Sequence, residues 1–156
     1  DIEVHGISGK SNEDEIIKLL NLKNLISRSE FMDEPTRPLD KALYAGAVDT
    51  VGGEILAKMI SKIELEGSVS CCGNVGGMNF TSSVFPFILR GVSLFGIDSA
   101  ESKIELKREL WERLATDWKL DLSQNSRVIS IKEVDQYINK ILDGSHSGRT
   151  VIKHGE

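Results

Sequence analysis

Apolar and polar positions along the chain follow two periods, which predict strands and helices in alternation. Short apolar or β-branched runs are typical of buried strands, and they occupy 2–7, 25–26, 44–51, 69–72, 92–98, 127–131 and 149–153. Longer segments with an apolar residue every three or four positions predict helices at about 13–22, 53–67, 101–118 and 132–142. Alternating strands and helices favour parallel βαβ units with right-handed crossovers.

The remaining segments and the helix faces complete this prediction. Prolines at 35 and 38 indicate that 29–40 is mainly loop, whereas 80–89 is interpreted as a short helix. The helix over 101–118 is expected to turn these residues toward a core: Ile104, Leu106, Leu110, Trp111 and Leu114. The helix over 132–142 is expected to do the same with Val134, Ile138, Ile141 and Leu142.

The order of the elements predicts an α/β fold, a Rossmann-like parallel sheet with helices on both faces. This arrangement accounts for the chain up to about residue 118. The last strand, helix and strand change character and are interpreted as a different structural unit. We therefore expect a nucleotide-binding domain over 1–125 and a second unit over 126–156.

Composition and charge narrow the class of protein. A length of 156 residues is enough for one domain with its own core. The formal net charge of -5 argues against a general nucleic-acid or membrane-surface binder, so neither partner is expected. No apolar run approaches the roughly 20 residues of a membrane span. The first residues do not resemble a secretory signal, and a cytoplasmic protein is expected, although the lack of an initiating Met suggests a piece of a longer chain.

The cysteines and histidines predict neither a disulfide nor a metal site. The two cysteines, Cys71 and Cys72, are adjacent, and a bridge between neighbouring strand positions would be strained. Three histidines, at 5, 146 and 154, are scattered without metal-ligand spacing. No metal cofactor is therefore expected.

A glycine-rich loop after the strand at 69–72 is the first candidate site. Gly73, Gly76 and Gly77 crowd this loop around Asn74. Glycine lets the backbone approach a ligand because it has no Cβ atom, and in open α/β sheets ligands bind beyond the carboxyl ends of the strands. The competing interpretation is a flexible connection between a strand and a helix.

Three other places carry candidate chemistry. The turn Ser8-Gly9-Lys10 ends the first strand, where dinucleotide-binding folds use an acidic residue to select NAD or a basic one to accommodate the 2′-phosphate of NADP. The alternative there is a solvated turn. Asp49, on an apolar strand, needs polar partners and is at least as well explained as a structural carboxylate. Arg149 opens the last strand, where a surface arginine is the commoner case.

Four segments, 45–52, 72–77, 86–99 and 148–153, carry a resemblance over essentially the whole chain. In this order they resemble the C-terminal half of a zinc-independent medium-chain dehydrogenase/reductase of the bacterial quinone oxidoreductase and acryloyl-CoA reductase type. The segment 86–99 is the most specific of the four. The resemblance implies an NADPH-dependent oxidoreductase that reduces an activated carbon–carbon double bond of a small-molecule substrate.

The resemblance also implies cofactor contacts by position. The residues that it assigns to cofactor binding are Ser8, Gly9, Lys10, Gly73, Asn74, Ile97, Asp98 and Arg149. The first three match the turn that holds the 2′-phosphate, and the next two match a loop near the nicotinamide half. The pair at 97–98 lies on the strand whose backbone faces the nicotinamide, and the arginine is expected near the cofactor. No catalytic residue is assigned within this chain.

The family pattern contains parts that this sequence does not. In the family a strand and a glycine-rich turn come before the position of Asp1, and a catalytic domain comes before them. The resemblance implies that the last strand, helix and strand, here 126–156, return to that catalytic domain. In the usual strand order that first strand lies between the strands at 2–7 and 47–51. Two strand edges are therefore expected to lack partners, and the chain alone is expected to bind NADPH poorly and to catalyse nothing.

The implied partners are the N-terminal catalytic domain of the same protein and a second copy in a homodimer. Two other functions remain open at this point. One is a zinc-containing alcohol dehydrogenase of the same superfamily, whose metal ligands would lie upstream. The other is a non-catalytic nucleotide-binding module.

Overall fold

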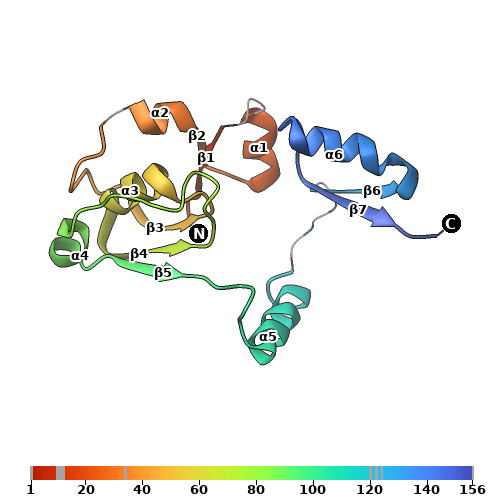
Figure 1. Cartoon of the computed structure of the whole chain (residues 1–156). Coiled ribbons are helices and arrows are strands. Elements are labelled where there is room, and N and C mark those ends of the chain that lie inside the picture. The colour runs from red at the N-terminus through yellow and green to blue at the C-terminus, as the bar shows by residue number, and fades with distance from the viewer. Residues whose placement is uncertain are drawn as a thin grey trace. The chain divides into compact units, whose positions relative to one another are not determined.

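The computed structural model describes residues 2–9, 13–33, 35–119, 121, 123 and 125–155 (Figure 1). The chain divides into two compact units. One contains β1 and the chain from Asn24 to Ile104, and the other contains α1 (Glu13–Leu20) and the chain from residue 105 onward. We describe each unit by itself.

Two parallel sheets form the first unit. The strand β1 (His5–Ser8) pairs with β2 (Asn24–Ser27), and a second sheet has the order β3 (Tyr44–Asp49), β4 (Ile63–Cys71) and β5 (Ser93–Gly96). Every pairing is parallel, and helices lie between successive strands, which confirms the predicted α/β class. The helices of this unit are α2 (Arg28–Asp33), α3 (Gly53–Ser61) and α4 (Phe85–Arg90).

The two sheets of the first unit share no strand pairing in the described part of the chain. The family pattern places a further strand between β1 and β3. Within the part of the chain that the structure describes, β1 pairs only with β2 and β3 only with β4. One edge of each therefore has no strand partner, as the sequence predicts. Open edges of this kind favour the addition of a further strand.

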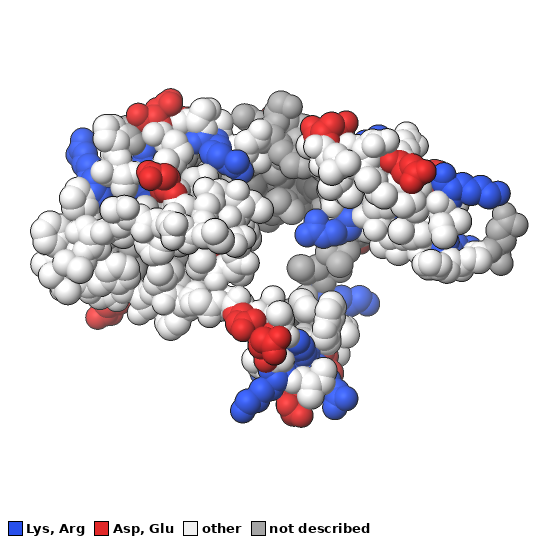
Figure 2. Space-filling view, viewed as in Figure 1, with Lys and Arg blue, Asp and Glu red and all other residues white. Residues whose placement is uncertain are grey.

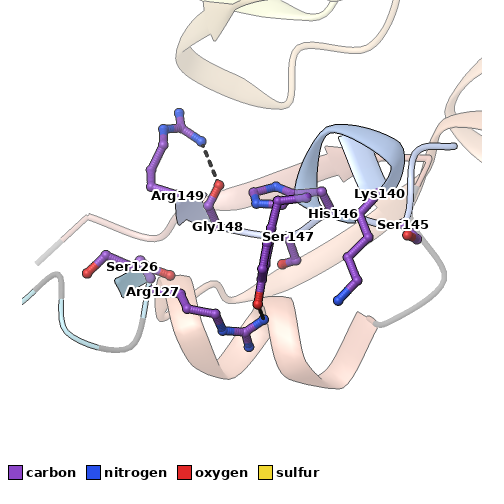
Figure 3. A pocket seen from close by; sticks show the side chains of 10 residues that line it. Ser126, Arg127, Lys140, Ser145, His146, Ser147, Gly148 and Arg149 are labelled. Atoms are coloured by element: carbon purple, nitrogen blue, oxygen red, sulfur yellow. Dashed lines mark hydrogen bonds between the residues drawn. The ribbon is translucent and has the colours of Figure 1, made fainter. Parts of the chain in front are cut away.

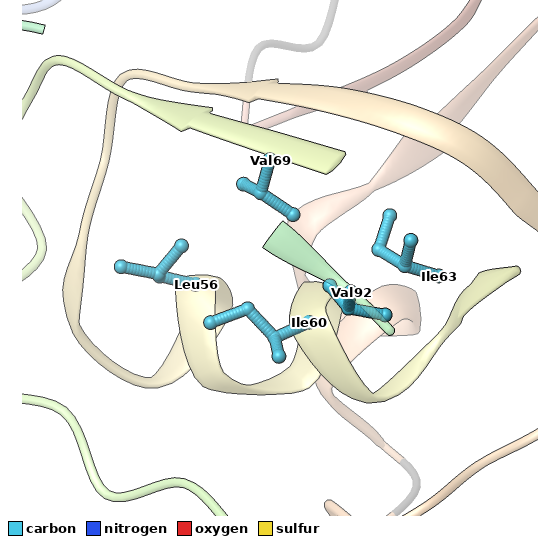
Figure 4. Close-up of a cluster of buried hydrophobic side chains, with 5 residues drawn as sticks. All are labelled: Leu56, Ile60, Ile63, Val69 and Val92. Carbon is cyan, nitrogen blue, oxygen red and sulfur yellow. The ribbon is translucent and has the colours of Figure 1, made fainter. Parts of the chain in front are cut away.

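The core of this unit lies between α3 and the neighbouring strands. Five almost completely buried side chains form it: Leu56, Ile60, Ile63, Val69 and Val92 (Figure 4). Burial of each such side chain contributes about 1.5–3 kcal/mol relative to exposure. The first two come from α3, and the others come from the strands or from the residue directly before one, so this cluster fixes the helix against the sheet.

The prediction that 29–40 is mainly loop is wrong for its first part, which is the helix α2. The hydroxyl Oγ of Ser27 accepts a hydrogen bond from the backbone N–H of Glu30 at 3.1 Å, which satisfies a donor at the start of the helix. Phe31 then buries its ring, with 6% exposure. Ser27 and Phe31 both lie before the prolines at 35 and 38. The prolines therefore restrict only the second half of 29–40.

The predicted helix that ends at Gly67 also needs correction, because α3 ends at Ser61 and β4 begins at Ile63. The first part of β4 is irregular: Tyr44 lies opposite Ile63, but Gly46 lies opposite Ser68. A Cβ atom on Gly67 would lie 2.5 Å from the backbone oxygen of Ala45, so only glycine fits this close approach. Gly67 is thus a constriction inside the strand rather than a helix stop.

A polar cluster ties α4 to the end of α3. The guanidinium of Arg90 donates hydrogen bonds from Nη1 to the carbonyls of Ser61, at 3.0 Å, and Ile63, at 2.9 Å. Its Nη2 donates to the carbonyl of Asp40. The buried ammonium of Lys62 donates to Asp40 Oδ2 at 2.9 Å, and this hydrogen bond is the main reason that the pKa of Asp40 is lowered.

The second unit is built around one βαβ motif. In addition to α1 it contains α5 (Ile104–Ala115), β6 (Ser126–Ser130), the 3-10 turn η1 (Ile131–Glu133), α6 (Val134–Leu142) and β7 (Arg149–Lys153). The strands β6 and β7 are parallel, with Ser126 opposite Arg149. The last strand has the predicted bounds. By contacts, α1 and α5 group with this unit. The boundary between two domains expected at residue 125 stays a prediction.

The apolar faces of α5 and α6 do not reach a core in the described residues, contrary to the prediction. No residue of either helix is buried, and the exposed fraction rises to 71% for Trp111 and 79% for Leu142. The physical reason is the small area of the covering structure, since α6 packs on a sheet of only two strands. The amphipathic patterns form helices as predicted, but their apolar faces stay exposed in the described part of the chain.

The described residues show neither a membrane-spanning helix nor a metal-binding cluster. None of their helices is both long and apolar enough to cross a membrane. Acidic and basic side chains are scattered over the face drawn in Figure 2. Among the described residues, no group of three or more His, Cys, Asp or Glu side chains is placed to hold a metal ion.

Candidate functional site

The carboxyl ends of three neighbouring strands form the candidate site in the first unit. The register places Asp49 opposite Cys71, and Cys71 opposite Gly96. The loops that follow these residues therefore begin at the same edge of the sheet. This brings together four of the predicted residues, Gly73 and Asn74 after β4, and Ile97 and Asp98 after β5.

The loops after β3 and β4 are packed backbone against backbone. The N–H of Gly76 donates to the carbonyl of Val51 at 2.7 Å, and Gly52 and Gly77 form a bridge between the loops. A Cβ atom on Gly73 would lie 2.0 Å from the backbone oxygen of Thr50. The glycine at 73 therefore has a structural reason, the contact between loops, which holds whether or not a ligand approaches it.

Asp49 is the buried residue that holds this edge together. Its Oδ2 accepts a hydrogen bond from the N–H of Gly52 at 2.9 Å, and its backbone carbonyl accepts one from the N–H of Cys72 at 2.9 Å. Both partners are loop amides, so the structural interpretation of Asp49 is confirmed.

Cys71 is not an activated nucleophile. Burial raises the pKa of its thiol, and a hydrogen bond to Asp49, 3.5 Å from Sγ to Oδ2, raises it further. A nucleophilic cysteine needs the opposite environment, one that stabilises the thiolate. Both cysteines are free thiols.

The strand end at β5 presents backbone rather than a reactive side chain. The N–H of Ile97 donates to the carbonyl of Cys71 at 2.9 Å, and its side chain is 49% exposed. The carboxylate of Asp98 accepts from the N–H of Glu101 at 3.1 Å and so stabilises its own turn. What this strand end offers a ligand is therefore an exposed apolar side chain and the adjacent backbone.

The predicted phosphate turn lies at the end of β1, but only in part within the described residues. Ser8 ends the strand, Gly9 follows it, and Lys10 lies outside the described residues. A Cβ atom on Gly9 would lie 3.7 Å from Cζ of Arg28. A second cation thus stands over this turn.

Arg28 was not among the residues predicted from the sequence, because its position depends on the register of β1 against β2. Ser8 lies opposite Ser27 in the parallel pair of β1 and β2. The residue after each strand end is therefore placed at the same edge. A basic residue directly after β2 is thus expected to lie beside the turn at 8–10.

Arg149 belongs to the second unit, whereas the other predicted residues that the structure describes belong to the first unit. Its N–H donates to the carbonyl of Asn125 at 2.7 Å, and its Nη1 donates to the carbonyl of Gly148 at 3.1 Å. It is exposed and opens β7, as predicted.

No family model matches the chain, but individual relatives do. The chain is 36% identical over 152 residues to AcuI of Escherichia coli, described as a probable acrylyl-CoA reductase. It is 37% identical over 153 residues to YhfP of Bacillus subtilis, provisionally named a quinone oxidoreductase. Each match covers 97% of this chain and 46% of the relative, so the chain spans about half the length of the curated relatives that it matches.

Solved structures of similar proteins share the fold closely. The YhdH oxidoreductase of Salmonella enterica, crystallised in complex with NADP, has a TM-score of 0.87 at 35% identity, over 98% of this chain and 47% of that one. The YhfP protein of Bacillus subtilis with NAD bound has a TM-score of 0.90 at 37% identity, over 97% and 47%. The α/β, Rossmann-like interpretation is therefore confirmed, and the match to about half of each relative fits an incomplete domain.

Proposed function

We propose that the chain belongs to the zinc-independent medium-chain dehydrogenase/reductase family, in its quinone oxidoreductase and acryloyl-CoA reductase group, and that it is the cofactor-binding half of an NADPH-dependent oxidoreductase. The substrates are quinones or enoyl thioesters such as acryloyl-CoA. The observation that carries the proposal is the agreement of sequence and fold with a relative whose crystals contain NADP.

The end of β1 suits the 2′-phosphate of NADPH. It offers the hydroxyl of Ser8, the backbone of Gly9 without a side chain, and the guanidinium of Arg28. Phosphate oxygens favour such donors, above all charged ones. Lys10 adds a second charge next to them in the sequence. An acidic residue, which would select NAD, does not follow β1 within Ser8–Lys10.

The carboxyl edge of β4 and β5 suits the nicotinamide half. The loop at Gly73 and Asn74 begins at this edge, and Ile97 supplies an exposed apolar side chain. When bound, NADPH supplies a hydride for the activated double bond. The residues of this chain hold and orient the cofactor, with Arg149 as a further contact, and the substrate carbonyl is polarised by groups outside this chain.

The proposal includes three features of the complete protein. A catalytic domain completes the substrate site, since the matched relatives are about twice as long as this chain. Two copies form a homodimer through the strand around Val92–Asp98, because β5 lies at an edge of its sheet in the described part of the chain. The protein acts in the cytoplasm.

Turnover tests the proposed function. The complete protein is mixed with NADPH, and acryloyl-CoA or a quinone is then added in separate reactions. The absorbance of NADPH is followed in each. We expect oxidation of NADPH that depends on one of these substrates. Tight binding of NADPH without turnover of any activated double bond would instead favour the non-catalytic nucleotide-binding module.

Cofactor preference tests the phosphate site. In the complete protein, Lys10→Ala and Arg28→Ala are each expected to weaken NADPH binding by about 1–3 kcal/mol, the contribution of one charge-assisted hydrogen bond, and to leave NADH binding nearly unchanged. The matched control is Lys23→Ala, whose ammonium pairs with the exposed Glu3 at 3.0 Å. Dissociation constants from calorimetry give the comparison, and equal losses for both cofactors would refute the assignment.

A further inference from the structure

A basic pocket lies in the second unit, at the end of the βαβ motif where β6 and β7 begin. It has a volume of about 260 Å³. The residues that line it are Asn125, Ser126, Arg127, Tyr137, Lys140, Ser145, His146, Ser147, Gly148 and Arg149. Three of these are permanent cations and none is a carboxylate, although acidic residues outnumber basic ones in the whole chain, 24 to 19.

One tyrosine ring holds two of the cations. The guanidinium of Arg127 lies 5.8 Å from the ring centre of Tyr137, and its Nη1 donates to the hydroxyl of Tyr137 at 3.1 Å. The ammonium of Lys140 lies 4.8 Å from the same ring centre. Figure 3 shows the charged ends of Arg127 and Lys140 on the same side of the pocket, whereas that of Arg149 is turned away toward Gly148.

The local backbone supports this arrangement. The N–H of His146 donates to the carbonyl of Lys140 at 2.9 Å, and the ring of His146 contacts Thr150 Oγ1 through Nε2 at 2.8 Å. These contacts hold the loop after α6 against the first residues of β7. Tyr137, Lys140 and His146 are half-buried and form the base of the pocket, whereas Arg127 is exposed and is held at its rim by the contact with Tyr137.

The charge balance favours an anion. The carbonyl end of α6 carries about half a negative charge, which is small against the two full positive charges of Arg127 and Lys140. Asp143 lies one turn beyond Lys140, and its Oδ1 accepts a hydrogen bond from the N–H of Ser145 at 2.8 Å. Asp143 does not line the pocket. Two like charges that share one ring repel each other, and an anion between them converts the repulsion into two attractive contacts.

We propose that this pocket binds the phosphate group of a phosphorylated adenosine, and that the ligand is the phosphoadenosine end of a coenzyme A thioester substrate. The proposal rests on the proposed function and selects between its two substrate classes, because quinones carry no phosphate. The cavity is too small for a whole dinucleotide but suits a phosphate with part of its sugar. The hydroxyls of Ser126, Ser145 and Ser147 add neutral donors around the two cations.

Titration of the complete protein with small phosphates tests the site, with NADPH present at saturation to occupy the cofactor site. The probes are adenosine 3′,5′-bisphosphate, the end of coenzyme A; adenosine 2′,5′-bisphosphate, the end of NADP; inorganic phosphate; and adenosine. We expect the 3′,5′ isomer to bind most tightly. We expect Lys140→Met and Arg127→Met each to weaken its binding about tenfold, whereas Lys153→Met, which removes an exposed cation on β7 outside the pocket, leaves it unchanged.

Binding of the 3′,5′ isomer no tighter than that of adenosine would overturn the site. So would binding of this isomer by Lys140→Met and Arg127→Met as tight as by the unsubstituted protein. Tighter binding of the 2′,5′ isomer or of inorganic phosphate would overturn the coenzyme A assignment. A protein that does not bind NADPH would contradict the proposed function alone, since the same titration is then run without it. In the active enzyme, Lys140→Met is expected to raise KM for acryloyl-CoA but not for acryloyl-pantetheine, which lacks the phosphoadenosine.

Discussion

Gly73→Ala is expected to lower the free energy of unfolding by about 3 kcal/mol and to weaken cofactor binding in the molecules that remain folded. The added Cβ atom would lie 2.0 Å from the carbonyl oxygen of Thr50 and 2.4 Å from its carbonyl carbon. These are backbone atoms, so no side-chain rotation relieves the clash. The loop after β4 must move away from the loop after β3, and the proposed nicotinamide edge moves with it.

A second glycine provides the matched control for this substitution. Gly96 ends the neighbouring strand β5, and a Cβ atom there would meet no other atom within 4 Å. Gly96→Ala is therefore expected to change the urea midpoint of the complete protein very little. Similar losses for the two variants would show that the loops are not packed as described.

Arg90→Met is expected to destabilise the protein by about 2–4 kcal/mol. The substitution keeps most of the aliphatic stem but removes the guanidinium, which donates to the carbonyls of Ser61 and Ile63 and, from a separate part of the chain, to that of Asp40. Those of Ser61 and Ile63 lie where α3 ends and β4 begins, and Ser61 is buried. Water can replace only part of these contacts, because Arg90 itself is half-buried.

The control for the loss of charge is Arg113→Met. Arg113 pairs with Glu109 one turn earlier on α5, at 3.1 Å, and both side chains are exposed. An exposed pair at this spacing contributes only about 0.3–0.5 kcal/mol. A shift in the urea midpoint as large as that for Arg90→Met would mean that general charge, and not the three carbonyl contacts, sets the effect.

The sequence predicted the fold well where period and burial agree. The strand at Arg149–Lys153 has the predicted bounds, and the alternation of strands and helices gave the parallel class. The errors lie where a local contact outweighs a general preference. The cap from Ser27 starts α2 ahead of the prolines, and the close approach of Gly67 to Ala45 keeps that residue inside a strand, where the pattern alone indicated a helix stop.

The candidate site was predictable in part for a similar reason. The resemblance placed Gly73 and Asp98 near the same half of the cofactor, and the structure gives the physical reason, since both follow parallel strands that end at one edge of the sheet. Arg28 follows from the same rule but requires the register of β1 against β2, which the sequence does not define. The basic pocket was not predictable, because Arg127 and Lys140 approach one another only through the ring of Tyr137.

Calorimetric titration of the complete protein with NADPH and, separately, with NADH tests the central claim most directly. The account predicts that NADPH binds at least about tenfold more tightly, because the proposed site at the end of β1 pairs the charges of Lys10 and Arg28 with a phosphate that NADH lacks. Equal binding of the two cofactors would contradict the phosphate site at the end of β1. Binding of neither would contradict the proposed oxidoreductase and leave a resemblance in fold alone.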